Sequence, residues 1–90
     1  MNGYTVVISE IAVKQLKKLD KSIAKIIVHW IEKNLEDCED PRLKGKPLKG
    51  DRGSQWRYRV GNYRLIAEIK DKKLIILIIS IGHRKEIYDD

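Results

Sequence analysis

The stretch WRYRVGNYRLIAEI, residues 56–69, decides the fold that this sequence predicts. Two runs that alternate large apolar residues with arginines flank a Gly-Asn dipeptide at 61–62, which is typical of a two-residue hairpin turn. Because side chains alternate between the two faces of a strand, this turn puts the apolar residues of both strands on one face, which we expect to face the core. These residues are Trp56, Tyr58, Val60, Tyr63, Leu65 and Ala67.

The other face of the predicted hairpin carries Arg57, Arg59 and Arg64, with Arg59 directly opposite Arg64. Like charges in opposite positions destabilise a sheet by up to ~1 kcal/mol. An anion bound to that face would turn the repulsion into affinity. A solvated sheet face on which the arginines lean apart, with Glu68 neutralising one of them, explains the same residues without a ligand.

The apolar run LIILIISI, residues 74–81, predicts a third strand that follows a two-residue turn at 71–72. In that register Ile79 is opposite Arg64, so Ile79, Ile81 and His83 fall on the arginine face. Histidine can move protons near neutral pH, which makes His83 a candidate catalytic residue. A lone histidine is nevertheless more often structural or simply exposed.

The first half of the chain predicts a short strand and two helices. The β-branched segment YTVVIS, residues 4–9, ends at Ser9, a residue type that often caps a helix. Apolar residues then recur at helical spacing in two segments, the second of which can be capped by Asp20. We expect these helices to form a hairpin, with Trp30 in the core.

Residues 36–54 contain both prolines and three glycines and show no periodicity, which predicts a loop. Loops of this length are often functional or become ordered on a partner, but Leu43 and Leu48 could instead pin this one to the core. The sequence leaves both alternatives open.

Length and composition predict one domain, residues 1–90, of the α+β class. The expected order is β-α-α-β-β-β, with a small twisted, mainly antiparallel sheet packed against an N-terminal helical hairpin. The formal charge of +6 favours a polyanionic partner such as nucleic acid or anionic membrane, or an acidic protein. The single cysteine, Cys38, excludes an internal disulfide, and we expect a reducing cytoplasm. The longest apolar run is far shorter than the ~20 residues that span a bilayer, and no signal segment follows Met1.

Three segments together resemble a known family: YTVVISEIAVKQLKKLD, DPRLKGKPLKGDRGSQWRYRVGNYRLIAEI and IISIGHRKEIY. In order and over nearly the whole chain they resemble the toxins of the RelE/ParE superfamily of toxin–antitoxin modules, specifically the RelE-like branch. The resemblance implies the toxin of a type II module, a ribosome-dependent endoribonuclease without cofactor or metal. Such a toxin cuts messenger RNA in the decoding (A) site by 2′-hydroxyl attack and so inhibits translation.

The resemblance also implies catalytic residues. Arg57 and Arg59 match a pair of basic residues on the first hairpin strand, and Arg64 matches the arginine of the YRL motif. Arg84 matches the basic residue after the final strand, and Tyr88 the tyrosine near the C-terminus. Several members have lysines where this chain has Arg57 and Arg59. Arginine stabilises charge but is effectively never deprotonated, so these two cannot serve as a base.

The base for the 2′-hydroxyl must then come from Tyr88, Glu86 or His83. A tyrosine would need surrounding cations to lower its pKa from its usual value near ~10. Tyr88 is our first candidate and His83 the second, although Tyr88 could instead be an anchor that packs the C-terminus on the helices.

Further basic residues would hold ribosomal RNA by its phosphates. In the loop these are Lys44, Lys46 and Lys49, and in the helices the lysines at 14, 17, 18, 21 and 25. A solvated helix surface explains the helical lysines almost as well.

The partners implied by the resemblance are the ribosome, messenger RNA and a RelB-like antitoxin that is acidic, partly disordered and folds on binding. No membrane is implied. Two other functions fit the residues. One is a ParE-like, non-enzymatic inhibitor of DNA gyrase with the same fold, and the other is a module that uses the arginine face only to bind nucleic acid.

Overall fold

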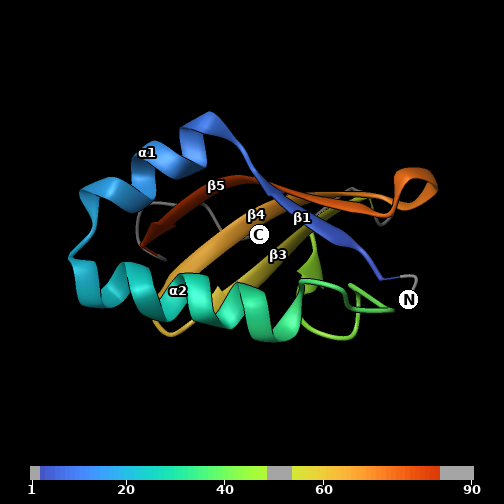
Figure 1. Cartoon of the computed structure of the whole chain (residues 1–90), viewed down its shortest axis with the longest axis horizontal. Coiled ribbons are helices and arrows are strands. Elements are labelled where there is room, and N and C mark those ends of the chain that lie inside the picture. Colours follow the sequence, from blue (N-terminus) through green and yellow to red (C-terminus); the bar gives the residue numbers. More distant parts are fainter. Residues whose placement is uncertain (1–2, 49–53, 84–90) are drawn as a thin grey trace.

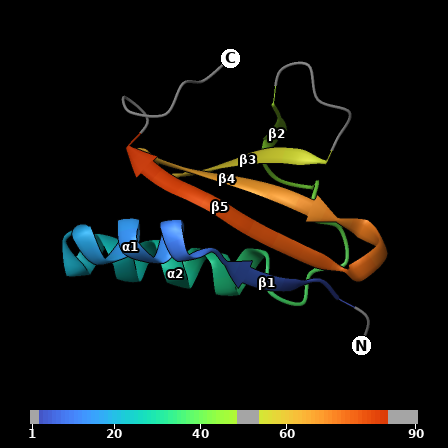
Figure 2. The ribbon, with the colours of Figure 1, turned by 90° about the horizontal axis from the view of Figure 1, so that it is seen from above.

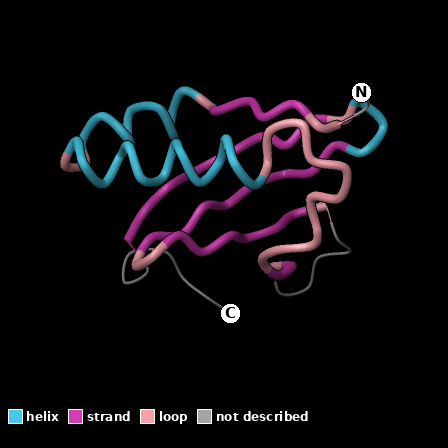
Figure 3. The backbone as a smooth tube through the Cα atoms, turned by 60° about the horizontal axis from the view of Figure 1, so that its bottom comes forward, coloured by secondary structure: helices cyan, strands magenta, loops and turns pink. Residues whose placement is uncertain are grey.

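The computed structural model of the chain describes residues 3–48 and 54–83. Figure 1 shows two helices beside a twisted sheet of five strands, and Figure 3 traces the same path as a tube. The strand order is β1-β5-β4-β3-β2, with β1 parallel to β5 and the other pairs antiparallel. The elements are β1 (Thr5–Ile8), α1 (Glu10–Lys18), α2 (Lys21–Asn34), β2 (Lys46–Pro47), β3 (Gln55–Val60), β4 (Tyr63–Lys70), the 3-10 helix η1 (Asp71–Lys73) and β5 (Ile75–His83).

The expected α+β architecture is confirmed, with one additional strand. The short β2 lies inside the segment that the sequence predicts to be loop, and it pairs with the outer edge of β3. None of the helices over residues 3–48 and 54–83 has the length and apolar character needed to cross a membrane.

The core lies between the helical hairpin and one face of the sheet. Figure 2 shows both helices on the same side of β3, β4 and β5. The predicted apolar face of the hairpin is buried there, except for Tyr63, which is half-buried. Trp30 of α2 packs on Tyr58 with ring centroids 5.8 Å apart, as expected for a core residue. The largest fully buried side chains are Ile27, Leu35, Tyr58, Leu65, Ile76 and Ile78.

The β3–β4 hairpin has the register that its turn predicts. Arg59 is opposite Arg64, and Gly61 has a positive φ of 60°, which glycine adopts at little steric cost. The connection from β4 to β5 differs from the prediction. Instead of a two-residue turn it consists of η1 followed by Leu74 in the left-handed region, and Gly82 rather than Ile79 is opposite Arg64.

A β-bulge at Ile79 then reverses the faces of β5. Ile78 is opposite Ala67 and Ser80 is opposite Ile66, so Ile79 is the extra residue between them. An inserted residue moves every later side chain to the other face. Ile81 is therefore 2% exposed in the core, and His83 is opposite Tyr63 with ring centroids 5.3 Å apart. The prediction that Ile81 and His83 share the arginine face is wrong.

Ser9 joins the start of α1 to this bulge. Its hydroxyl accepts a hydrogen bond from the backbone N–H of Ala12 at 3.1 Å, which confirms the predicted cap, and donates to the carbonyl of Ile79 at 2.9 Å. Its own N–H donates to the carbonyl of Ile78 at 3.0 Å. One short side chain thus satisfies the helix end and the irregular part of β5.

We predict that Ser9→Ala lowers the free energy of unfolding by about 1–3 kcal/mol, since it removes a helix cap and leaves a bulge carbonyl without its hydroxyl donor. Ser22→Ala is the matched control. Its hydroxyl donates only to the exposed Asp20 carboxylate, so its loss should cost less than about 0.5 kcal/mol in the same urea titration. Equal stability of the two variants would contradict the double role of Ser9.

Candidate functional site

A pocket of about 260 Å³ is lined by residues on the face of the sheet opposite the buried Tyr58 and Leu65. It brings together the three arginines of the hairpin and one residue from β2. The lining residues are Gly45, Lys46, Arg57, Arg59 and Arg64. Lys46, which the sequence suggests as an RNA contact, therefore lies in the same pocket as the predicted catalytic arginines.

Among the described residues, four cations line this pocket as two neighbouring like-charge pairs. Arg59 is opposite Arg64 across β3 and β4, and Lys46 is opposite Arg57 across β2 and β3. Arg64 is only 3% exposed and is the one buried charged residue in the described part of the chain. Each such pair is unfavourable by up to ~1 kcal/mol on its own. This concentration of positive charge suits a bound anion.

Glu68, the neutralising partner that a plain solvated face would use, is opposite Gln55 on β3 and Leu77 on β5. It therefore stands diagonal to Arg57 and not directly across from any of the arginines. It does not line the pocket.

The loop after α2 reaches the pocket because Gly45 allows the backbone to come close to β3. Gly45 has a φ of 81°, and a Cβ there would collide with the carbonyl oxygen of Arg57 and crowd the rings of Trp56 and Tyr58. Only glycine combines this conformation with this approach.

We predict that Gly45→Ala destabilises the protein more than Gly61→Ala. Both alanines would need a positive φ, which costs roughly 1–2 kcal/mol, but the site of Gly61 is open while that of Gly45 faces backbone atoms. Chemical denaturation should therefore give a loss of roughly 1 kcal/mol for Gly61→Ala and at least ~2 kcal/mol for Gly45→Ala. The reverse order would show that the loop moves away without cost.

Aromatic side chains of β3 hold this loop by their polar atoms. Tyr58 donates its hydroxyl to the carbonyl of Pro41 at 2.6 Å, and the indole N–H of Trp56 donates to the carbonyl of Lys44 at 2.7 Å. Leu43 is 80% exposed, whereas Leu48 is half-buried. The loop is thus pinned to the core, as one alternative suggested, but not by Leu43. Figure 3 shows it in pink between α2 and β2.

A charged network adds a second attachment of the loop. Arg42 binds Asp71 of η1 through two hydrogen bonds of 3.0 Å, and its guanidinium lies 5.7 Å from the centre of the Trp56 ring. Tyr4 donates its hydroxyl to Asp71 at 2.6 Å. The hydrogen bonds from Arg42 and then Tyr4 hold the pKa of the Asp71 carboxyl below its ordinary value. This network was not predicted from the sequence, because its residues are far apart in the chain and lie in segments without periodicity.

We predict that this network weakens in acid. Asp71 ionises at lower pH in the folded than in the unfolded chain, so its contribution is complete above the unfolded pKa of about 3.9 and is lost as the pH falls through the lowered native value. The difference in unfolding free energy between the wild type and Asp71→Asn should therefore shrink as the pH falls from about 5 toward 2.

Arg42→Gln should remove much of the same contribution to stability. The double variant Arg42→Gln/Asp71→Asn should therefore lose less unfolding free energy than the sum of the losses of the two single variants. Strict additivity at neutral pH would show that the two side chains do not stabilise one another.

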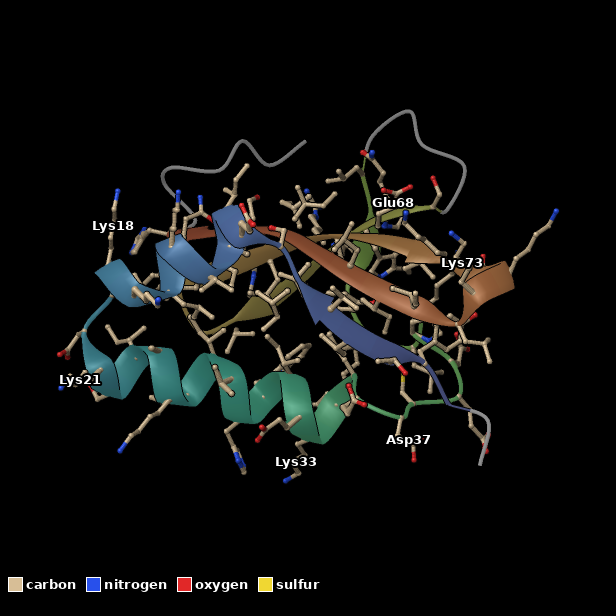
Figure 4. The ribbon with its side chains drawn as sticks, turned by 45° about the horizontal axis from the view of Figure 1, so that its top comes forward. Lys18, Lys21, Lys33, Asp37, Glu68 and Lys73 are labelled. Carbon is tan, nitrogen blue, oxygen red and sulfur yellow. The ribbon has the colours of Figure 1, made fainter. Side chains whose placement is uncertain are left out.

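The other predicted site residues that the structure describes do not line this pocket. His83 is on the helix side of the sheet, and Lys44 lines a different hollow, near Cys38 and Pro41. The helical lysines at 14, 17, 18, 21 and 25 are exposed; Figure 4 labels Lys18 and Lys21 near the bend between the helices. Four further predicted site residues lie outside the described residues: Lys49, Arg84, Glu86 and Tyr88. No cluster of three or more metal-binding side chains occurs within 3–48 and 54–83.

Comparison with known proteins identifies the family. A family model described as the ParE toxin of the type II toxin–antitoxin system, parDE, matches residues 6–88. The chain belongs to this toxin family. Within it the chain is RelE-like: it is 32% identical over 85 residues to "Toxin RelG" of Mycobacterium tuberculosis, covering 94% of this chain and 95% of that relative.

Two further relatives agree with a RelE-like toxin. The "mRNA interferase toxin RelE" of Escherichia coli (strain K12) is 28% identical, with 98% of this chain and 93% of that toxin covered. The crystal structure of the toxin–antitoxin complex RelBE2 from Mycobacterium tuberculosis contains a chain with a TM-score of 0.80 and 31% identity. The match covers 93% of this chain and 94% of that one.

Proposed function

We propose that this RelE-like toxin is an endoribonuclease that cuts messenger RNA in the decoding site of the ribosome. The observation that carries the proposal is the pocket in which Arg57, Arg59, Arg64 and Lys46 meet. A relative that is named as an mRNA interferase, and that matches nearly the whole of this chain, supports the same activity. The reaction that fits such a pocket is attack of a ribose 2′-hydroxyl on the adjacent phosphate, which gives a 2′,3′-cyclic phosphate and a 5′-hydroxyl.

The arginines would act by stabilising charge. The phosphorane that forms during the attack carries more negative charge on its oxygens than the phosphodiester, so fixed cations lower the barrier. Arg59 and Arg64 stand opposite each other and can hold the phosphate from two strands. Because the pair is already assembled by the sheet, little reorganisation is needed when the charge develops.

The base that accepts the 2′-hydroxyl proton must be another group, because a guanidinium keeps its proton. Tyr88 remains our first candidate on the basis of the sequence, with Glu86 as an alternative. His83 is less favoured, because its register puts it beside Tyr63, on the face of the sheet that does not carry the arginines.

The partner of the toxin under this proposal is an acidic, partly disordered RelB-like antitoxin in the cytoplasm. Structural relatives have been solved as RelB–RelE complexes, and the net charge of +6 favours an acidic partner. Ribosomal RNA would bind through the exposed helical lysines at 14, 17, 18, 21 and 25 and through Lys44 and Lys46 of the loop.

The second candidate function is ParE-like inhibition of DNA gyrase without catalysis, which the description of the matching family favours. A gyrase inhibitor has no need for like-charge pairs that converge on one pocket, so the cationic site favours the nuclease.

We predict that the toxin cuts messenger on programmed ribosomes and leaves a 2′,3′-cyclic phosphate. Cut sites should be mapped with and without ribosomes, and the product ends identified chemically. Products with a 3′-hydroxyl and a 5′-phosphate would rule out 2′-hydroxyl attack. Inhibition of gyrase supercoiling without any cleavage would favour the second function.

In the same assay Arg59→Ala should lower the single-turnover rate by about 10²–10³-fold, because it removes a cation from the developing charge. Because Arg59 is exposed and faces a like charge, the unfolding free energy of the Arg59→Ala variant should equal that of the wild type or be slightly higher. A rate within a few-fold of the wild type would remove Arg59 from the reaction.

A further inference from the structure

Among the described residues that line the cationic pocket, Lys46 is the one whose side chain comes from the loop, and its backbone is held on both sides. The preceding Lys44 carbonyl accepts the Trp56 indole N–H at 2.7 Å, and the following Leu48 N–H donates to the carbonyl of Gln55 at 3.2 Å. β-Pairing aligns Lys46 with Arg57, so both side chains leave the sheet on the pocket face. Lys46 is therefore set in the pocket by specific contacts, although β2 has only two residues.

Lys46 also differs chemically from its neighbours. The other three cations that line the pocket are guanidinium groups, which do not give up a proton in proteins. An alkylammonium group is a much stronger acid than a guanidinium, and the amine that it leaves can take up another proton. Among the described residues that line the pocket, only Lys46 can both carry positive charge and transfer a proton.

The proposed cleavage requires such a proton at the leaving group. The departing 5′-oxygen is an alkoxide unless it is protonated as its bond to phosphorus breaks, and a positioned acid typically accelerates such a step by ~10² to 10⁴-fold. Stabilising charge on the phosphate with arginines does not supply this proton. The exposed position of Lys46 would let its amine recover a proton from water between turnovers.

We infer that Lys46 is the general acid of the cleavage reaction, an assignment that rests on the proposed function. The 2′-oxygen forms its bond to phosphorus while its proton passes to a separate base, which is neither Lys46 nor an arginine. The bond between phosphorus and the 5′-oxygen breaks, and Nζ of Lys46 donates its proton to that oxygen. Lys46 is left as a neutral amine and is reprotonated by solvent.

The test uses Lys46→Arg with two messengers on programmed ribosomes. One has the natural 5′-oxygen at the cut site, and the other has a 5′-bridging sulfur, which leaves as a thiolate without needing an acid. The arginine keeps the charge but is a very poor proton donor. Lys46→Arg should slow single-turnover cleavage of the oxygen substrate by about 10²-fold or more, and cut the sulfur substrate within a few-fold of the wild type.

Lys33→Arg is the matched control, because Lys33 is an exposed residue of α2 that Figure 4 shows pointing away from the sheet. It should cut both substrates at the wild-type rate. If Lys46→Arg slows both substrates equally, Lys46 does not donate the proton and the assignment is overturned. If Lys46→Arg cuts the oxygen substrate as fast as the wild type, the assignment is overturned as well.

Failure of the proposed function gives a different result. In that case the wild-type toxin itself would cut neither substrate on ribosomes. A wild type that cuts, with a Lys46→Arg variant that behaves like it, would overturn only the role of Lys46.

Discussion

The register between β3 and β4 is the constraint on which the rest of the structure depends. It is set by the turn at Gly61, where a positive φ closes the hairpin after Val60 and restarts it at Tyr63. From this turn the alternation of side chains sends one set of residues to the helices and the other to the pocket. A slip of one residue would move Tyr58 into solvent and Arg59 into the core, so burial of the aromatic face and assembly of the arginine face are one event.

The pocket is supported by the core beneath it. The two like-charge pairs of this face, Arg59 with Arg64 and Lys46 with Arg57, are each unfavourable as pairs. Burial of Tyr58, Leu65 and the helical residues on the opposite face must offset that cost. The sheet therefore keeps the cations close together despite their mutual repulsion. This is the preorganisation that anion binding and charge stabilisation need.

Sequence reasoning succeeded where a local signal existed. The Gly-Asn turn gave the register of the hairpin, and Ser9 marked the start of α1. It failed for β5, because residues 74–79 are all apolar and leave no alternation from which a bulge at Ile79 could be read. The error propagated to His83, whose face depends on counting residues through the bulge.

The charged network of Arg42, Asp71 and Tyr4 could not be predicted from the sequence for a different reason. Arg42, Asp71 and Tyr4 belong to three separate segments, and their meeting depends on the packing of the whole chain. β2 was missed because Lys-Pro has no strand propensity, and it forms only because the loop is already held beside β3. Of the candidate site, the three arginines followed from the hairpin alone, whereas the approach of Lys46 required the tertiary fold.

The loop couples the two faces of the sheet. Trp56 and Tyr58 fill the core with their rings, and the same side chains use their N–H and O–H groups to hold the backbone that leads to Gly45 and Lys46. A substitution at either aromatic residue would therefore disturb the core and the wall of the pocket together. Arg59 lies on an exposed face with no such link to the core, so its chemistry can be separated from stability. The residues that shape this pocket thus fall into two classes. Substitution of those whose side chains are also in the core changes both stability and the pocket, whereas substitution of those without a core contact can test the reaction alone.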